Sequence, residues 1–169
     1  PVEMIRTTEM KTEIIAVGSE LLTPFFLDTN SLFLTERLND LGIQVAFKTV
    51  VGDDPADLLE AIRTALRRSE LIIAIGGLGP TEDDRTCEAF AEAVGRKRVL
   101  HPEVLKSIRS RFERRGVAMP ASNRKQAFIV EGAEILENPN GTAPGLWIDL
   151  PGSKIALLPG PPPELKPRG

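Results

Sequence analysis

The stretch LIIAIGGLGPTEDD, residues 71 to 84, decides the fold class of this 169-residue chain. Its first five residues are all apolar, which predicts a strand that is buried on both faces. The strand then breaks into a glycine-rich turn, as strands do before phosphate-binding loops, but this turn ends in the carboxylates Glu82, Asp83 and Asp84. Because phosphate and carboxylate repel each other, the stretch predicts either no phosphate or a positive charge between the two groups.

Strand-like and helix-like patterns alternate on both sides of this stretch. The strand patterns begin at residue 11 and cover residues 43–52 and 71–77. The helix patterns cover residues 28–42, 54–69, 87–94 and 101–116. Unbroken apolar strands that alternate with helices are typical of a parallel sheet covered on both faces. We therefore predict an α/β fold, a three-layer α/β/α sandwich with a mostly parallel sheet.

The first two predicted helices carry signals at their ends. Asp28 and Asp54 stand where an N-cap oxygen is needed, and Gly42 stands where a left-handed C-terminal residue is needed. Leu38 and Leu41 fall on one stripe of the first helix, which predicts that both face the core.

The pattern changes in the last third of the chain. Short strand-like runs at 133–138, 145–150 and 154–160 are joined by turn-rich segments, which predicts C-terminal β-hairpin strands. The strand and helix patterns together define one expected domain at 10–165. We expect an N-terminal extension at 1–9 and the start of a truncated or frayed C-terminal continuation at 166–169.

Composition limits the chemistry of the site. Hydrophobic content of 41% and charged content of 27% are ordinary for a globular domain, and we expect a cytoplasmic protein with no membrane segment or signal peptide. With one cysteine, Cys87, and one histidine, His101, the ligand count excludes a Cys/His zinc site. Any metal is therefore expected to bind through oxygen, and Cys87 is expected to be a small core residue.

The charges are unevenly distributed along the chain. Residues 96–125 contain ten Lys or Arg and two Glu, although the formal net charge of the whole chain is −3. This basic segment either forms a solvated helix face or attracts a negatively charged molecule, such as a phosphorylated ligand or an acidic partner. We expect no nucleic-acid partner, because the chain has no Tyr, one Trp and no interleaving of basic and aromatic residues.

The glycine turn matches neither the Walker loop nor the Rossmann fingerprint in its spacing. Its backbone N–H groups at a helix N-terminus still predict an anion site. Asp53 follows another predicted strand, so it is expected at the same sheet edge as Asp83 and Asp84. Carboxylates beside an anion site imply a bridging divalent cation, whereas capping of the next helix is the alternative role for Asp83 and Asp84.

Seven segments together resemble one known family. They are AVGSELL, DTN, VVGDD, GGLGPTEDDRT, NRKQA, NPNGTAPG and LLPGPPPE, in this order between residues 16 and 164. The chain is thereby similar to the N-terminal domain of CinA, the competence/damage-inducible protein, from the molybdopterin-binding superfamily of MoaB and MogA. The resemblance implies metal-dependent hydrolysis of ADP-ribose to AMP and ribose 5-phosphate, although the chain lacks the Glu-rich box of Nudix pyrophosphatases.

The resemblance also implies site residues. The expected ligand-binding residues are Gly76, Gly77, Gly79, Pro80, Thr81, Asp28, Asn30, Asn140, Gly141 and Thr142. The expected ligands of a divalent Mg, Mn or Co ion are Asp84 with Asp83 or Asp53, and Lys125 is expected to offset charge on a leaving phosphate. Helix capping remains the alternative for Asp28 and Asn30, and an Asn-Gly hairpin turn for Asn140 and Gly141.

Two other functions remain open at this point. The same loop suits the phosphate of molybdopterin, as in the relatives that make the molybdenum cofactor, or a nucleotide bound by a non-catalytic regulatory module. We also expect a homo-oligomer, in the first instance a dimer, because the strands around Trp147 would otherwise leave an apolar sheet edge exposed.

Overall fold

The centre of the structure is a six-stranded mixed sheet with the strand order β2-β1-β3-β8-β7-β6. The computed structural model describes residues 10–165, so the extension expected at 1–9 and the continuation expected at 166–169 lie outside the described residues. The strands are β1 (Thr12–Val17), β2 (Val45–Val51), β3 (Leu71–Ile75), β6 (Glu134–Leu136), β7 (Gly145–Leu150) and β8 (Ser153–Leu158). The first four in the order are parallel, β7 runs antiparallel to β8, and β6 runs antiparallel to β7.

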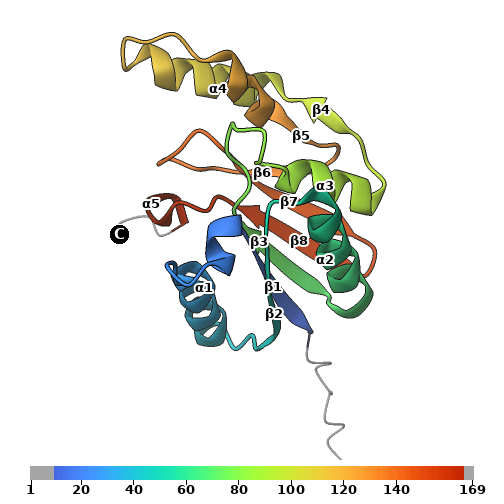
Figure 1. Cartoon of the computed structure of the whole chain (residues 1–169). Helices are drawn as coiled ribbons and strands as arrows, with labels where there is room; N and C mark the ends of the chain where they lie inside the picture. Colours follow the sequence, from blue (N-terminus) through green and yellow to red (C-terminus); the bar gives the residue numbers. More distant parts are fainter. Residues whose placement is uncertain (1–9, 166–169) are drawn as a thin grey trace, which may run out of the picture.

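Helices cover both faces of this sheet (Figure 1). They are α1 (Thr29–Asp40), α2 (Pro55–Arg68), α3 (Thr86–Val94) and the short α5 (Pro162–Leu165), whereas α4 (Pro102–Glu113) lies in a separate lobe. On one face, Ile62 of α2 and Phe90 of α3 belong to the main core cluster with β1, β3 and β8. On the other face, Leu38 of α1 packs in a second cluster, to which Leu165 of α5 is joined. The predicted three-layer sandwich is confirmed.

The predicted helix ends are confirmed, with one exception in the stripe. Asp28 accepts a hydrogen bond from Ser31 N at the start of α1, and Asp54 caps α2 in the same way. Gly42 has a φ of 77°, in the left-handed region. Leu41 is 75% exposed, so its expected place in the core is wrong: it follows the last turn of α1, where the helical period no longer applies.

A small second sheet was not predicted. Strands β4 (Arg98–Leu100) and β5 (Phe128–Val130) pair antiparallel, beside α4 and the 3₁₀ segment η2 (Ala121–Ala127). Figure 1 shows this lobe above the main sheet. Each strand has three residues, too few to show a period of two. The basic segment at 96–125 lies largely in this lobe, and Arg109, Arg114 and Arg115 are exposed.

The C-terminal strands form the predicted hairpins. A turn with Gly152 at a φ of 86° joins β7 to β8, and β8 also pairs in parallel with β3, so the hairpin extends the main sheet. The edge strand β6 has three residues and an exposed Glu134. Trp147 lies one strand inside and packs against the second core cluster. The apolar edge on which we based the expected dimer is therefore absent among residues 10–165.

Cys87 has the expected structural role. It is partly buried against the main core cluster, and its Sγ donates to the carbonyl oxygen of Phe128 at 3.6 Å. Burial raises the pKa of this thiol to about 11, so it is protonated at neutral pH. Within residues 10–165, no helix is long and apolar enough to cross a membrane.

One carboxylate is buried at the opposite end of the sheet from the glycine turn. Glu13 on β1 has no exposed surface, and both its oxygens accept hydrogen bonds from Arg68, at 2.6 and 3.0 Å. Ser69 Oγ and Thr49 Oγ1 also donate to it, at 2.9 and 3.0 Å. The Arg68 guanidinium stacks on the Phe47 ring at 3.8 Å. This network joins β1, β2 and the end of α2.

Candidate functional site

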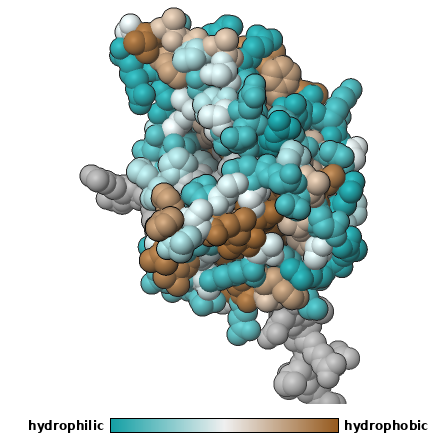
Figure 2. Space-filling view, viewed as in Figure 1, coloured by the Kyte–Doolittle hydropathy of each residue, from teal (hydrophilic) through white to brown (hydrophobic). Residues whose placement is uncertain are grey.

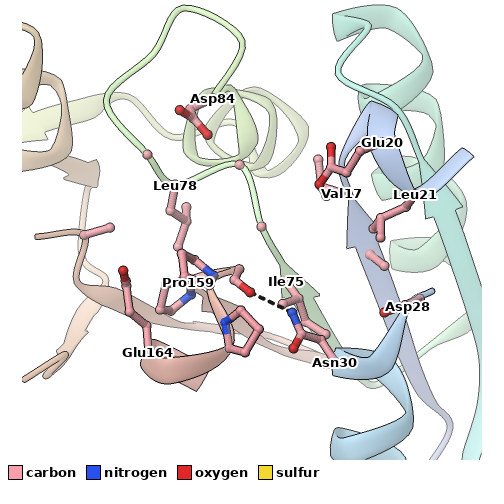
Figure 3. A pocket seen from close by; sticks show the side chains of 18 of the residues that line it. Val17, Glu20, Leu21, Asp28, Asn30, Ile75, Leu78, Asp84, Pro159 and Glu164 are labelled. Atoms are coloured by element: carbon pink, nitrogen blue, oxygen red, sulfur yellow. Dashed lines mark hydrogen bonds between the residues drawn. The ribbon is translucent and has the colours of Figure 1, made fainter. Parts of the chain in front are cut away.

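A cavity of about 630 Å³ lies at the carboxyl ends of β1, β3 and β8. This is the edge of a parallel sheet at which ligands bind in α/β proteins. Its walls are the glycine loop after β3, the segment from the 3₁₀ turn η1 (Ser19–Leu22) to the start of α1, and the segment from β8 to α5. Figure 3 shows Asp84 on the glycine loop, with Glu20 and Glu164 on other walls of the same space.

The carbonyl groups of the glycine loop are held by hydrogen bonds from Thr86 and Gln126. The Gly76 oxygen accepts from Thr86 Oγ1 at 2.7 Å, and the Gly77 oxygen from Thr86 N at 3.1 Å. The Leu78 oxygen accepts from Gln126 Nε2 of η2 at 3.3 Å. Gly76 and Gly77 have φ values of 97° and 70°, and a Cβ at Gly77 would collide with the Thr86 hydroxyl. This geometry requires glycine at both positions.

The amide groups of the same loop remain free. The N–H groups of Gly77, Leu78 and Gly79 donate no hydrogen bond to any residue in the described range, 10–165. All three residues line the cavity, as does Pro80. Consecutive free N–H groups in a loop with positive φ form a concave site for an anion. The loop therefore has the backbone arrangement that binds phosphate.

Asp84 shapes the end of this loop. Its Oδ2 accepts from Thr81 N at 2.9 Å and from Thr81 Oγ1 at 2.6 Å, while the side chain also lines the cavity. Thr81 itself is exposed and does not line the cavity. The N-cap of α3 is Arg85, without a side-chain cap, so the alternative role of Asp83 and Asp84 as caps of that helix is not observed.

The three expected metal ligands lie in two places. Asp53 and Asp83 line a separate hollow of about 400 Å³ with Ser19 and Arg85, whereas Asp84 faces the main cavity. Asp53 is engaged there, since its Oδ2 accepts from Ser19 N at 3.2 Å. Nowhere in residues 10–165 do three His, Cys, Asp or Glu side chains group closely enough to hold a metal ion. Asp84, Asp83 and Asp53 therefore do not fit together as one metal centre.

Lys125 lies behind the glycine loop. Its Nζ donates to the Thr81 oxygen at 2.5 Å and is 3.9 Å from a Glu88 oxygen. It lines a void of about 30 Å³ on that side and does not line the main cavity. In this structure Lys125 supports the loop from the side opposite the cavity.

Asp28 and Asn30 both line the cavity at the start of α1. Asp28 caps the helix, as the alternative interpretation expected. Asn30 Nδ2 donates to the Gly160 oxygen at 2.7 Å and so joins α1 to the segment after β8 (Figure 3). Asn30 Oδ1 is buried and accepts no hydrogen bond from the described residues. An unsatisfied buried acceptor at a cavity wall marks a place for a donor from water or a ligand.

The loop between β6 and β7 contributes one of its three expected residues to the cavity. Thr142 lines the cavity, whereas Gly141 packs against Glu164 and Asn140 Nδ2 donates to the Pro163 oxygen at 2.8 Å. Neither Asn140 nor Gly141 has a positive φ, so they do not form a two-residue Asn-Gly hairpin turn. The two residues connect the loop to α5.

Three cavity residues were missed in the sequence. Glu20 follows β1, Glu164 belongs to α5, and the buried Gln126 holds the glycine loop from η2. Glu20 had a usable signal, because it follows a strand of the parallel sheet, as Asp53 does. Gln126 and Glu164 lie within NRKQA and LLPGPPPE, two of the segments that carry the resemblance, but nothing local to them indicated contact with the cavity.

The ionisable side chains of the cavity wall are all acidic. The ionisable residues that line it are Glu20, Asp28, Asp84 and Glu164, and none of the described lining residues is Lys, Arg or His. The ten basic residues of segment 96–125 therefore do not reach it. An anionic ligand in this cavity meets backbone N–H groups and carboxylates, so its charge requires a cation that is not a side chain.

The glycine loop, its free amides and the position of the cavity agree with the family comparison. The model for the probable molybdopterin-binding domain matches residues 13–167, so the chain belongs to this family. Within it, the chain is 52% identical over 161 residues to a CinA-like protein of Koribacter versatilis and 54% identical over 157 residues to one of Solibacter usitatus. The resemblance to the N-terminal domain of CinA is thereby confirmed.

This chain spans less than half the length of these two relatives. The alignments include 93% of this chain but 39% and 38% of the two relatives. Among solved structures, CinA of Thermoplasma acidophilum, a protein of unknown function, superposes with a TM-score of 0.85 and 37% identity, covering 93% of this chain and 92% of that one. MoaB of Thermus thermophilus gives a TM-score of 0.61 at 22% identity, covering 93% and 85%, which supports the fold alone.

Proposed function

We propose that this domain binds a phosphorylated nucleotide or pterin in the main cavity and hydrolyses a nucleotide pyrophosphate, with ADP-ribose as the leading substrate. Water adds across a P–O bond of the pyrophosphate, which gives AMP and ribose 5-phosphate. The observation that carries the proposal is the row of free N–H groups at Gly77, Leu78 and Gly79, three residues that line the cavity and whose loop carbonyls are already hydrogen-bonded.

We further propose that a divalent cation, Mg²⁺, Mn²⁺ or Co²⁺, enters with the ligand. Asp84 is its proposed contact on the protein, because Asp84 Oδ1 accepts no hydrogen bond from the described residues and the cavity wall lacks basic side chains. Such a cation neutralises phosphate charge and lowers the pKa of a bound water. A pair formed by one carboxylate and the ligand's own phosphates suits Mg²⁺, which rarely uses an all-protein site.

The proposal is tested with metal-free protein and ADP-ribose. Mg²⁺, Mn²⁺ and Co²⁺ are added in turn, and AMP is measured by chromatography. Release of AMP that depends on the cation supports the proposal. If no cation gives AMP and ADP-ribose does not raise the melting temperature, the cavity does not take this substrate.

The second candidate is binding of molybdopterin or its adenylylated form. It is favoured by the family of probable molybdopterin-binding domains and by the shared fold with MoaB of Thermus thermophilus. Oxidation of the purified protein should then release a fluorescent pterin. A third outcome, a nucleotide-dependent rise in melting temperature without product, indicates a regulatory binding module.

Replacing Lys125 by Met is predicted to weaken ligand binding about tenfold, the effect of losing one charge-assisted hydrogen bond to the loop. The physical reason is that Lys125 Nζ holds the Thr81 carbonyl, next to the turn that Asp84 closes. Steady-state kinetics should show a higher KM for ADP-ribose at nearly constant kcat. Arg124→Met, at the exposed neighbouring residue, is the control. A fall in kcat alone would instead support the charge-offsetting role expected from the sequence.

The expected dimer remains a prediction, which rests on the resemblance because relatives of this fold assemble. Light scattering at micromolar concentration should give about twice the mass of 18.4 kDa. A mass near that of one chain would count against it.

A further inference from the structure

The segment before α1 exposes three large apolar side chains in a row. Phe25 is 87% exposed, Phe26 58% and Leu27 86%. Figure 2 shows apolar side chains gathered on the lower half of this face, where α1 lies in Figure 1. Single exposed apolar residues are ordinary, but a contiguous group of them marks a binding surface.

These side chains differ in their relation to the cavity. Phe26 and Leu27 line it together with Leu21, whereas Phe25 does not. The same cavity has the free N–H groups of the glycine loop on another wall. One wall therefore suits an anion, and another offers an aromatic and aliphatic surface made by Leu21, Phe26 and Leu27.

We propose that Phe26 binds the planar heteroaromatic ring of the ligand by stacking, while the glycine loop binds its phosphate. The inference rests on the proposed phosphate site. It assigns a residue to the ring of the ligand, for which the phosphate site provides none. A cavity of about 630 Å³ is far larger than a phosphate and is within the range of sites for small organic ligands. An aromatic side chain stacks on any planar base, so adenine and pterin share this chemistry.

The experiment compares ligands with and without the ring, in the presence of Mg²⁺. Isothermal titration of the wild-type chain should show tighter binding of AMP than of ribose 5-phosphate. Phe26→Ala should weaken AMP binding about tenfold, the effect of losing one base–aromatic stack, and leave ribose 5-phosphate binding unchanged. Phe26→Trp should retain AMP binding and show quenching of the new indole by the ring. Neopterin monophosphate, titrated in parallel, decides between adenine and pterin as the preferred ring.

Phe25→Ala is the matched control, because Phe25 is adjacent and more exposed but lies outside the cavity. It should change neither affinity. The inference is overturned if Phe25→Ala costs as much as Phe26→Ala, or if Phe26→Ala weakens AMP and ribose 5-phosphate equally. It is also overturned if either alanine variant lowers the mass in light scattering, which would assign the segment to a contact between two copies.

The failure of this inference can be separated from that of the proposed function. If ribose 5-phosphate binds and AMP binds no tighter, the phosphate site stands and the ring site is wrong. If neither compound binds to the wild-type chain, the phosphate site itself is wrong and the ring site falls with it.

Discussion

Asp84→Asn is expected to lower the rate of ADP-ribose hydrolysis by about 10²-fold, the effect of removing a principal electrostatic group from a phosphate site. The amide oxygen of Asn can still accept the hydrogen bonds that Thr81 N and Thr81 Oγ1 donate to Asp84 Oδ2. The turn is therefore expected to keep its shape, while the negative charge that attracts the cation is lost. Steady-state release of AMP across a titration of Mg²⁺ measures the effect.

The control for Asp84 is Glu82→Gln. Glu82 is exposed, belongs to the same turn and does not line the cavity, so its loss removes the same charge without a change at the site. Its activity should stay within about twofold of wild type, as for a surface charge. Asp83→Asn measures whether the separate hollow that Asp83 lines with Asp53 contributes to ADP-ribose hydrolysis. Wild-type hydrolysis by Asp84→Asn at every cation concentration would reduce Asp84 to the residue that closes the turn.

Glu13→Ala is expected to reduce the free energy of unfolding by about 2–3 kcal/mol, the cost of leaving buried hydrogen-bond donors unsatisfied, since the partly exposed Arg68 can still be solvated. Glu13 has no exposed surface, and its removal leaves Ser69 Oγ and Thr49 Oγ1 without their acceptor. Urea denaturation followed by circular dichroism measures the loss. Glu60→Gln is the matched control, because Glu60 makes an exposed ion pair with Arg67 at 3.6 Å, worth about 0–1 kcal/mol.

The Glu13 network also predicts a dependence of stability on pH. Burial alone would raise the pKa of Glu13, but the hydrogen bonds from Arg68, Ser69 and Thr49 outweigh it and lower the pKa below its ordinary value of 4.5. A carboxylate with a lowered folded-state pKa stabilises the protein above its unfolded pKa, and this stabilisation is lost as pH falls through the folded value. The stability difference between wild type and Glu13→Gln should therefore shrink below about pH 4. A difference that stays constant down to pH 2 would contradict the network.

The layers of the fold could be predicted because each depends on a pattern of neighbouring residues. The apolar run of β3 and the capping residues Asp28 and Asp54 are local signals, and all three are confirmed. The strands β4 and β5 have three residues each and pair across about 30 positions, so no local pattern could indicate them. At Leu41 a local pattern gave a wrong prediction: the apolar stripe of α1 was extended to a residue that lies just after the end of the helix.

The site was predictable where its residues are consecutive. Gly76, Gly77 and Gly79 form one loop, so their sequence already indicated their common surroundings. Asp83 and Asp84 are also consecutive, yet they face different hollows, because adjacent side chains in a turn point in different directions. The contact of Lys125 with Thr81 joins residues 44 positions apart. Side-chain direction and distant contacts both require the folded chain.

The hydrogen bond between Asn30 and Gly160 spans 130 residues, so the cavity has no complete wall until both ends of the domain have met. A contact of such long sequence separation requires a large loop to close, which costs chain entropy. We therefore expect the ligand to bind the folded domain and not the unfolded chain, because the cavity walls come from distant parts of the sequence. Ligand binding then stabilises the native state as a whole, and its affinity can be read from global unfolding as well as from the cavity itself.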